Sequence, residues 1–164
     1  MNQVDILNPK GRWIVKHKRR GVQIGEYDFP NGIPDAAKNA LLDTMFNAAT
    51  QDSSWFIGLI DNASFTGLSN SDTMASHAGW NEYTNYTGSR PSWGQGAAAA
   101  KAISNSSPAQ FVFTTSSGVV AGIFINGDST KGGNITLLWS TALFPALLSV
   151  QSGDELNVTY VLSV

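Results

Sequence analysis

The sequence predicts a mainly β protein: a jelly-roll-like or immunoglobulin-like two-sheet sandwich with one short helix and an N-terminal β-hairpin arm. Three observations point there. Short apolar segments recur along the 164 residues, separated by Gly, Asn, Ser and Pro turn signals. Helical periodicity is convincing in one segment alone. Charged residues make up only 13% of the chain, so Asn, Ser, Thr and Gly supply most of its polarity.

The first predicted element is a β-hairpin between Gly11 and Phe29. Residues 12–16 are rich in β-forming side chains, and Arg19-Arg20-Gly21 can turn the chain. Pro30-Asn31-Gly32 then ends the second strand. We therefore expect residues 1–30 to form a basic arm or hairpin, distinct from a sandwich body of residues 31–164.

The second predicted element is a helix at about residues 34–49. Pro34 suits the first helical position, and Asp35 suits the first turn, where the helix dipole favours an acid. Apolar residues recur at the helical period, which predicts one face that covers an end or a face of a sheet. These residues are Ala37, Leu41, Leu42, Met45, Phe46 and Ala49.

The remaining predicted elements are strands, which gives about eight in all. Residues 55–60 form a nearly continuous apolar run, as a buried central strand would. Residues 119–125 are apolar on both alternating faces, so both faces can be covered. Further strands are expected around Ile103, Phe111 and Phe113, at 134–140 and, after a turn at 152–154, at 156–164.

A long irregular segment at residues 62–96 holds clustered aromatic residues. A loop of this length in a compact domain is usually functional or part of an interface. Its side chains could stack on sugar rings, build an interface with another protein, or fill a small core beneath the loop. The candidate oligomer-contact or glycan-contact residues are Trp80, Tyr83, Tyr86, Arg90 and Trp93.

Charge is unevenly distributed along the chain. Residues 1–20 hold six basic residues and one acid, whereas the rest holds four basic and eleven acidic residues. A basic leading segment on an acidic body predicts docking on an acidic surface. The alternative is a solvated hairpin whose charges prevent aggregation through its edge.

The sequence predicts that the protein is not an enzyme. It has no cysteine and only two histidines, and no Gly-x-Ser-x-Gly motif accompanies them. Asp72 and His77 could belong to a triad, but holding the long loop in shape is the expected role. Possible carboxylate pairs, such as Asp72 with Glu82, are of a kind that chance supplies. No metal-ligand spacing or phosphate loop is present, so we expect neither metal nor cofactor.

Composition also predicts the compartment. The first ten residues contain no apolar segment of the kind that a secretory signal needs, and no run is long enough to span a membrane. The absence of cysteine suits assembly in a reducing cytoplasm.

Several blocks of sequence resemble a family of small structural proteins of tailed bacteriophages. These proteins are variously described as head-decoration, cement, head-fibre or tail-fibre proteins. The resemblance covers nearly the whole chain. Its blocks are residues 11–15, 39–43, 55–61, 71–83, 90–93, 138–144 and 152–160.

The resemblance implies a non-enzymatic virion protein. The first expectation is a capsid decoration (cement) protein on the capsid exterior, assembled in the host cytoplasm. It would bind the major capsid protein and copies of itself, as a trimer or dimer, but no membrane and no specific nucleic acid. Removal of residues 1–20 should then abolish capsid binding and leave a folded body. The expected capsid or neighbour contacts are Arg12, Trp13, Lys16, Lys18, Arg19 and Arg20.

The alternative that the resemblance leaves open is a tail or fibre component. In that case the aromatic segment would contact glycans on the host surface.

Overall fold

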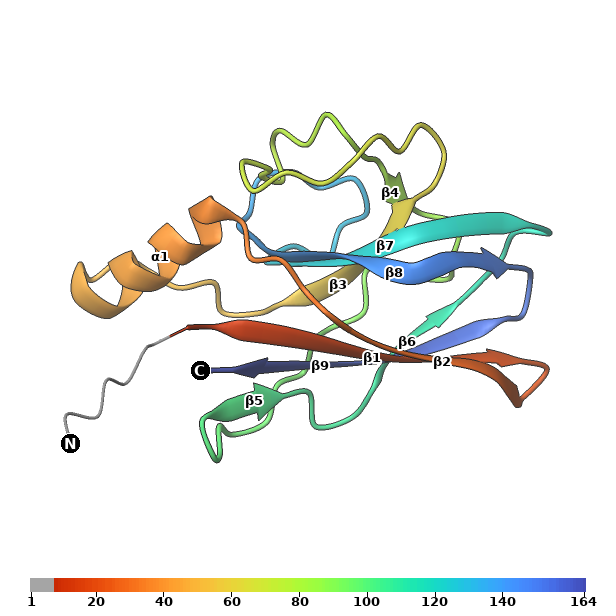
Figure 1. Cartoon of the computed structure of the whole chain (residues 1–164), viewed down its shortest axis with the longest axis horizontal. Helices are drawn as coiled ribbons and strands as arrows, with labels where there is room; N and C mark the ends of the chain where they lie inside the picture. The colour runs from red at the N-terminus through yellow and green to blue at the C-terminus, as the bar shows by residue number, and fades with distance from the viewer. Residues whose placement is uncertain (1–7) are drawn as a thin grey trace.

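The computed structural model, which describes residues 8–164, is a sandwich of two antiparallel sheets (Figure 1). Sheet A has the order β2-β1-β9-β5, and β6 pairs with β9 beside β5. Its strands are β1 (Lys10–Arg19), β2 (Val22–Pro30), β5 (Ala102–Ser104), β6 (Ala109–Val112) and β9 (Glu155–Ser163). Sheet B has the order β4-β3-β7-β8. Its strands are β3 (Phe56–Asp61), β4 (Glu82–Tyr83), β7 (Gly118–Asn126) and β8 (Leu138–Val150). The predicted two-sheet β fold is confirmed.

The main core lies between the two sheets. Alternate residues of a strand point to opposite faces, so Trp13 and Val15 of β1 enter the core, and Lys16 faces solvent. Val158 and Tyr160 of the neighbouring strand β9 enter the same core. These four core side chains are fully buried. Their burial removes large apolar surfaces from water and is the main force that holds sheet A against sheet B.

The N-terminal hairpin forms as predicted, but it is part of the sandwich. Arg20 and Gly21 both have positive φ angles, as the two-residue turns that suit twisted hairpins require. Strand β1 lies between β2 and β9 and pairs with β9 from Lys10↔Ser163 to Lys18↔Glu155. This corrects the predicted division at residue 30, because residues 10–30 contribute both core and sheet to the body. Residues 1–7 of the expected arm lie outside the described residues.

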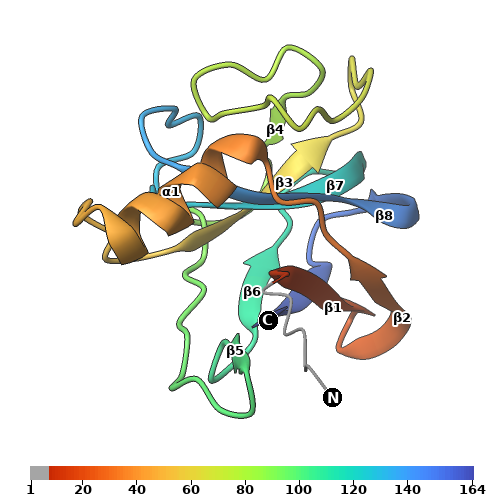
Figure 2. The same cartoon turned by 60° about the vertical axis from the view of Figure 1, so that its left-hand side comes forward.

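The long segment at residues 62–96 covers the outer face of sheet B (Figures 1 and 2). Below it lies a second, smaller core cluster, to which Met74 and Trp80 of the segment and Phe124 of β7 belong. Consequently every residue of β7 from Val120 to Asn126 is buried, in agreement with the prediction that this strand is covered on both faces.

The single helix of the described residues is α1 (Asp35–Phe46), close to the predicted span. Its apolar face is only partly covered. Ala37 is fully buried and Leu41 partly buried, but Leu42, Met45 and Phe46 are 53%, 67% and 79% exposed. The expected covering of a sheet therefore holds for the first half of the helix and not for the second.

The strand predicted at residues 134–140 starts later and runs further. Strand β8 begins at Leu138 and continues to Val150, and it includes Pro145. Proline cannot donate a ladder hydrogen bond, but β8 is an edge strand of sheet B, where proline is tolerated. Within residues 8–164, no helix is both long and apolar enough to cross a membrane.

Candidate functional site

The five side chains proposed from the aromatic segment are buried. Trp80 is 2% exposed and lies in the core beneath the segment. Tyr83, Tyr86 and Trp93 belong to the main core, and Arg90 is 1% exposed. Of the three interpretations of this segment, the small core beneath the loop holds for Trp80, whereas Tyr83, Tyr86 and Trp93 lie in the main core. Burial corrects the predicted contact role of Trp80, Tyr83, Tyr86 and Arg90, whereas Trp93 also lines a pocket that is described below.

Arg90 is held in a buried ion pair. It donates to both carboxylate oxygens of Glu82, at 2.8 Å and 2.9 Å, and to the main-chain carbonyls of Asp128 and Gly133. Its guanidinium lies 5.2 Å from the ring centroid of Phe124. These contacts join the long segment to the loop between β7 and β8, so Arg90 has a structural role.

Asp72 and His77 do not form a triad. Asp72 accepts hydrogen bonds from the main-chain N–H of Ser69, at 2.9 Å, and from Nε1 of Trp80, at 3.0 Å. Nδ1 of His77 lies 2.9 Å from the carbonyl oxygen of Trp80, and its ring stacks on that indole. Both residues therefore hold the loop in shape.

The six predicted contact residues of the hairpin have different environments. Trp13 is fully buried, which corrects its assignment as a contact residue. Arg12 forms an exposed ion pair with Asp28. Lys16 and Arg20 are exposed, and Lys18 is partly exposed.

The sixth residue, Arg19, takes part in a buried network around Asp154. Arg19 donates to both carboxylate oxygens of Asp154, at 2.8 Å and 2.7 Å. His17 Nε2 and the N–H of Gln151 each donate to Oδ2 at 3.0 Å. These hydrogen bonds, with that from Arg19 the strongest, lower the pKa of Asp154 to about 2. The network ties the hairpin turn to the turn that precedes β9.

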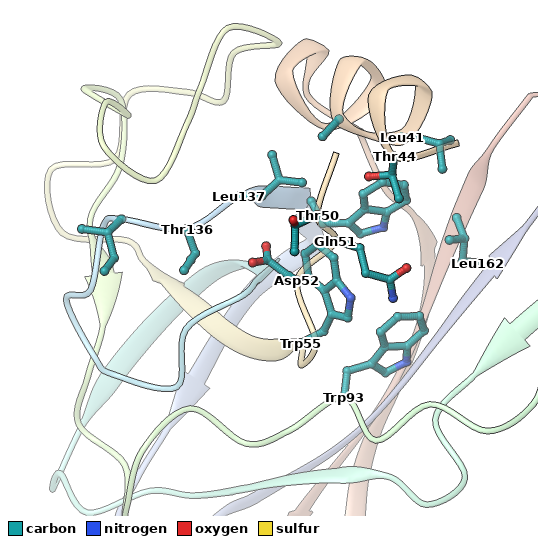
Figure 3. A pocket seen from close by; sticks show the side chains of 13 residues that line it. Leu41, Thr44, Thr50, Gln51, Asp52, Trp55, Trp93, Thr136, Leu137 and Leu162 are labelled. Atoms are coloured by element: carbon teal, nitrogen blue, oxygen red, sulfur yellow. The ribbon is translucent and has the colours of Figure 1, made fainter. Parts of the chain in front are cut away.

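An apolar hollow lies where α1 meets the end of the sandwich (Figure 3). This tryptophan pocket has a volume of about 450 Å³. Three indoles line it, from the loop before β3 (Trp55), from the long segment (Trp93) and from β8 (Trp139). Aliphatic side chains complete the apolar wall: Ala40, Leu41, Ile135, Leu137 and Leu162.

Two of the three indoles are fixed by hydrogen bonds to one residue of β9. Trp93 Nε1 donates to the main-chain oxygen of Tyr160 at 3.1 Å, and Trp139 Nε1 donates to the Tyr160 hydroxyl at 3.2 Å. Trp55 packs edge-on against Trp139, with ring centroids 6.1 Å apart. Burial raises the pKa of Tyr160 to about 12, so its hydroxyl stays protonated at neutral pH. The pocket is therefore preformed.

The polar lining comes mainly from the linker between α1 and β3. Thr50, Gln51 and Asp52 lie beside Thr44 of the helix, and Thr136 is contributed by the loop before β8. Asp52 is the one charged residue in the lining. Within residues 8–164 its carboxylate has neither an ion-pair partner nor a side-chain hydrogen bond. The pocket is thus apolar and aromatic, with a single anionic group.

One lining residue of this pocket, Trp93, was among the contact residues predicted from the sequence. Trp55, Trp139 and Asp52 were not predicted. Asp52 lies just before a predicted strand, Trp55 is the first residue of that strand, and Trp139 lies inside another, so each looked like a core or loop residue. The signal in the sequence that could have indicated the pocket is tryptophan, a scarce residue. Three of the chain's five tryptophans line the pocket.

The lining offers a ligand aromatic and aliphatic contacts, neutral hydrogen-bonding groups and one carboxylate. No group of three or more histidine or acidic side chains in the described part of the chain could hold a metal ion. The lining contains no histidine, lysine or serine that could serve as a base or nucleophile beside Asp52.

No model of a known protein family matches the chain, and no curated protein matches it either.

Proposed function

We propose that the protein is a non-enzymatic structural component of a tailed-phage particle, a decoration (cement) protein that binds the major capsid protein shell. The observation that carries the proposal is strand β2. It is nine residues long, forms the outer edge of sheet A and is largely exposed. The resemblance of the sequence blocks to small virion proteins supports the same role.

Strand β2 offers a ready surface for another chain. An edge strand presents N–H and C=O groups that can pair with a strand of a neighbour. Its exposed side chains include Val22 and Ile24, which are 65% and 50% exposed. Natural edges are usually protected by charge or proline, and β2 has such protection only in its second half, which holds Glu26, Asp28 and Pro30. The first half, residues 22–25, is uncharged and is the part of the edge that we propose pairs with a partner strand.

Charges beside this edge would orient the contact. Lys16 and Lys18 lie on the solvent face of β1, and Arg20 occupies the turn. Glu26 of β2 lies opposite Lys16, and Glu155 of β9 lies opposite Lys18. The surface therefore carries charges of both signs, and Arg20 projects from the turn as a further cation. Electrostatic contacts of this kind set register and association rate more than affinity. The β2 edge therefore supplies the affinity in this proposal, and the hairpin charges supply the orientation.

The test is co-sedimentation of purified protein with capsid shells that lack it. Ile24→Lys should weaken binding at least tenfold, because lysine on an edge strand opposes further pairing. The triple variant K16E/K18E/R20E should slow association and make it less sensitive to salt. Lys101→Glu is the control, since this exposed lysine lies outside the hairpin and should bind like the parent.

Unchanged affinity of Ile24→Lys would remove the edge as the docking surface. Antibody labelling of intact virions separates the two locations on the particle. Label over the head supports decoration, whereas label confined to the tail would favour a tail component. The burial of Trp80, Tyr83, Tyr86 and Trp93 gives no support to glycan binding by the aromatic segment.

A further inference from the structure

The tryptophan pocket lies away from the proposed docking edge. The hairpin turn and α1 stand at opposite ends of the long axis of the molecule (Figure 1). A protein docked through β2 and the hairpin turn would leave the pocket free. The pocket thus needs an explanation of its own, and its function does not depend on the proposed role in the virion.

We propose that the tryptophan pocket binds an alkylated ammonium group, such as a trimethylammonium group on a short apolar stem. Aromatic faces attract such cations through the negative charge of their π systems, and tryptophan does so most strongly. The lining holds three indoles and one carboxylate, without any lysine, arginine or histidine, and this composition favours a cation. Trp55 is the most accessible of the three indoles, whereas Trp93 and Trp139 are 4% and 7% exposed and reach the pocket with only part of each ring. The same surface disfavours phosphates and carboxylates, because Asp52 would repel them.

The rigidity of the pocket supports binding of a small ligand. The indole N–H groups of Trp93 and Trp139 are already used by Tyr160, so these rings cannot turn to donate to a ligand. They can offer only π surface and apolar contact. Because the rings are fixed before binding, little conformational entropy is lost when a ligand enters.

The anionic group has a dedicated space. A Cβ atom at Gly127 would lie 2.6 Å from Oδ2 of Asp52, so the carboxylate occupies room that only glycine leaves. Apart from Asp52, the polar lining is neutral: the hydroxyls of Thr44, Thr50 and Thr136 and the amide of Gln51. No cation within the lining competes with a ligand for Asp52.

The aliphatic walls separate this ligand class from sugars, which also stack on tryptophan. Leu41, Leu137 and Leu162 offer no hydrogen-bond partner to a bound sugar. Its hydroxyls would depend on the few threonine, glutamine and aspartate groups of the lining, and each hydroxyl left unpaired is costly on burial. The methyl groups of an alkylated ammonium need no such partners. The mixture of indole, leucine and one carboxylate therefore fits the cation better than a polyol.

The first experiment uses the full chain, with choline as the probe. Isothermal titration and quenching of tryptophan fluorescence should both show saturable binding. The matched neutral compound is 3,3-dimethylbutan-1-ol, which has the shape of choline but carbon in place of the charged nitrogen. It should bind at least about tenfold more weakly. Equal binding of the two compounds, or no saturable binding of choline, would overturn the proposal.

Variants locate the interaction. Asp52→Asn should lower choline affinity about fivefold or more, and Gly127→Ala should do the same by displacing the carboxylate. Asp43→Asn is the control: it makes the same charge change on α1, outside the pocket lining, and should leave affinity unchanged. Equal losses in Asp43→Asn and Asp52→Asn would overturn the assignment of Asp52. Thermal unfolding of each variant establishes that the fold is retained.

Two further binding measurements identify the source of the ammonium group. A short peptide with trimethyllysine that binds more tightly than choline would indicate a modified protein as ligand, and the reverse order would indicate a small molecule. Glucose provides the competing class. Saturable glucose binding as tight as that of choline would overturn the proposal in favour of a sugar site.

Discussion

At the residue scale, Asp154 is the most constrained ionisable group. It is fully buried and accepts hydrogen bonds from Arg19, His17 and a main-chain N–H. Its carboxylate joins the turn of the β1–β2 hairpin to the turn between β8 and β9. A single side chain therefore fixes two strand connections that lie far apart in the sequence.

The lowered pKa of Asp154 predicts a loss of stability in acid. Its folded-state pKa is about 2, below the ordinary value of 3.8, so the unfolded chain binds the proton more readily. The contribution of Asp154 to the free energy of unfolding is present above about pH 4 and is lost as the pH falls toward 2. Asp154→Asn should lower the free energy of unfolding at pH 7 by roughly 2 kcal/mol, because Arg19 and His17 lose their charged acceptor.

Urea unfolding at pH 7, 4, 3 and 2 measures this effect. The difference between parent and Asp154→Asn should shrink steadily as the pH is lowered below 4. A difference that stays constant down to pH 2 would show that ionisation of Asp154 does not stabilise the fold.

Residue patterns drew attention to the aromatic segment, but they did not predict whether its side chains are buried or exposed. Arg90 and the clustered Trp and Tyr residues were predicted to contact a partner or a glycan, whereas their side chains are buried. Composition alone cannot tell a buried aromatic from an exposed one, because both positions favour large rings. The buried pairing of Arg90 with Glu82 depends on a chain path that local sequence does not specify.

At the scale of elements, α1 leaves the second half of its apolar face uncovered. Its sequence gave the right position, because Pro34, Asp35 and the helical period are local signals. Periodicity shows that an apolar face exists, but it does not show that another element covers it. The packed part is the first half, around Ala37 and Leu41, which leaves Met45 and Phe46 exposed.

This arrangement predicts opposite responses to substitution along α1. The double variant M45K/F46S should change the free energy of unfolding by less than about 0.5 kcal/mol, because both side chains are mostly in water. Leu41→Ala should lower it by about 1–2 kcal/mol, since Leu41 packs against the main core. Urea unfolding measures both values. A loss above 1 kcal/mol in the double variant would mean that the end of α1 is packed in solution.

At the scale of the whole molecule, the sandwich followed from the sequence but its strand partners did not. Alternating apolar patterns and turn residues identify strands one at a time. They do not identify β9 as the neighbour of β1, because that pairing joins segments about as far apart as the chain allows. The separate arm was therefore a reasonable but incorrect inference from local charge. The tryptophan pocket escaped prediction for the same reason, since its walls come from distant segments.

The position of β1 changes the expected result of an N-terminal deletion. Removal of residues 1–20 takes Trp13 and Val15 from the core and leaves β9 without its partner on one side. The truncated chain should be unfolded or insoluble, as judged by circular dichroism. The full-length K16E/K18E/R20E variant alters only the solvent side of the same hairpin and should remain folded. A folded truncated protein would restore the idea of a separable arm.

The pairing of β1 with β9 also sets the order of events during synthesis. Strand β1 leaves the ribosome well over a hundred residues before β9, the strand beside which it must lie. Until β9 is made, one edge of β1 stays unpaired, and the core that buries Trp13 and Val15 is incomplete. Sheets built from such distant contacts form slowly, so the nascent chain carries an aggregation-prone strand at least until β9 is made. Production in cells should therefore depend on chaperones and temperature more than the stability of the finished sandwich would suggest.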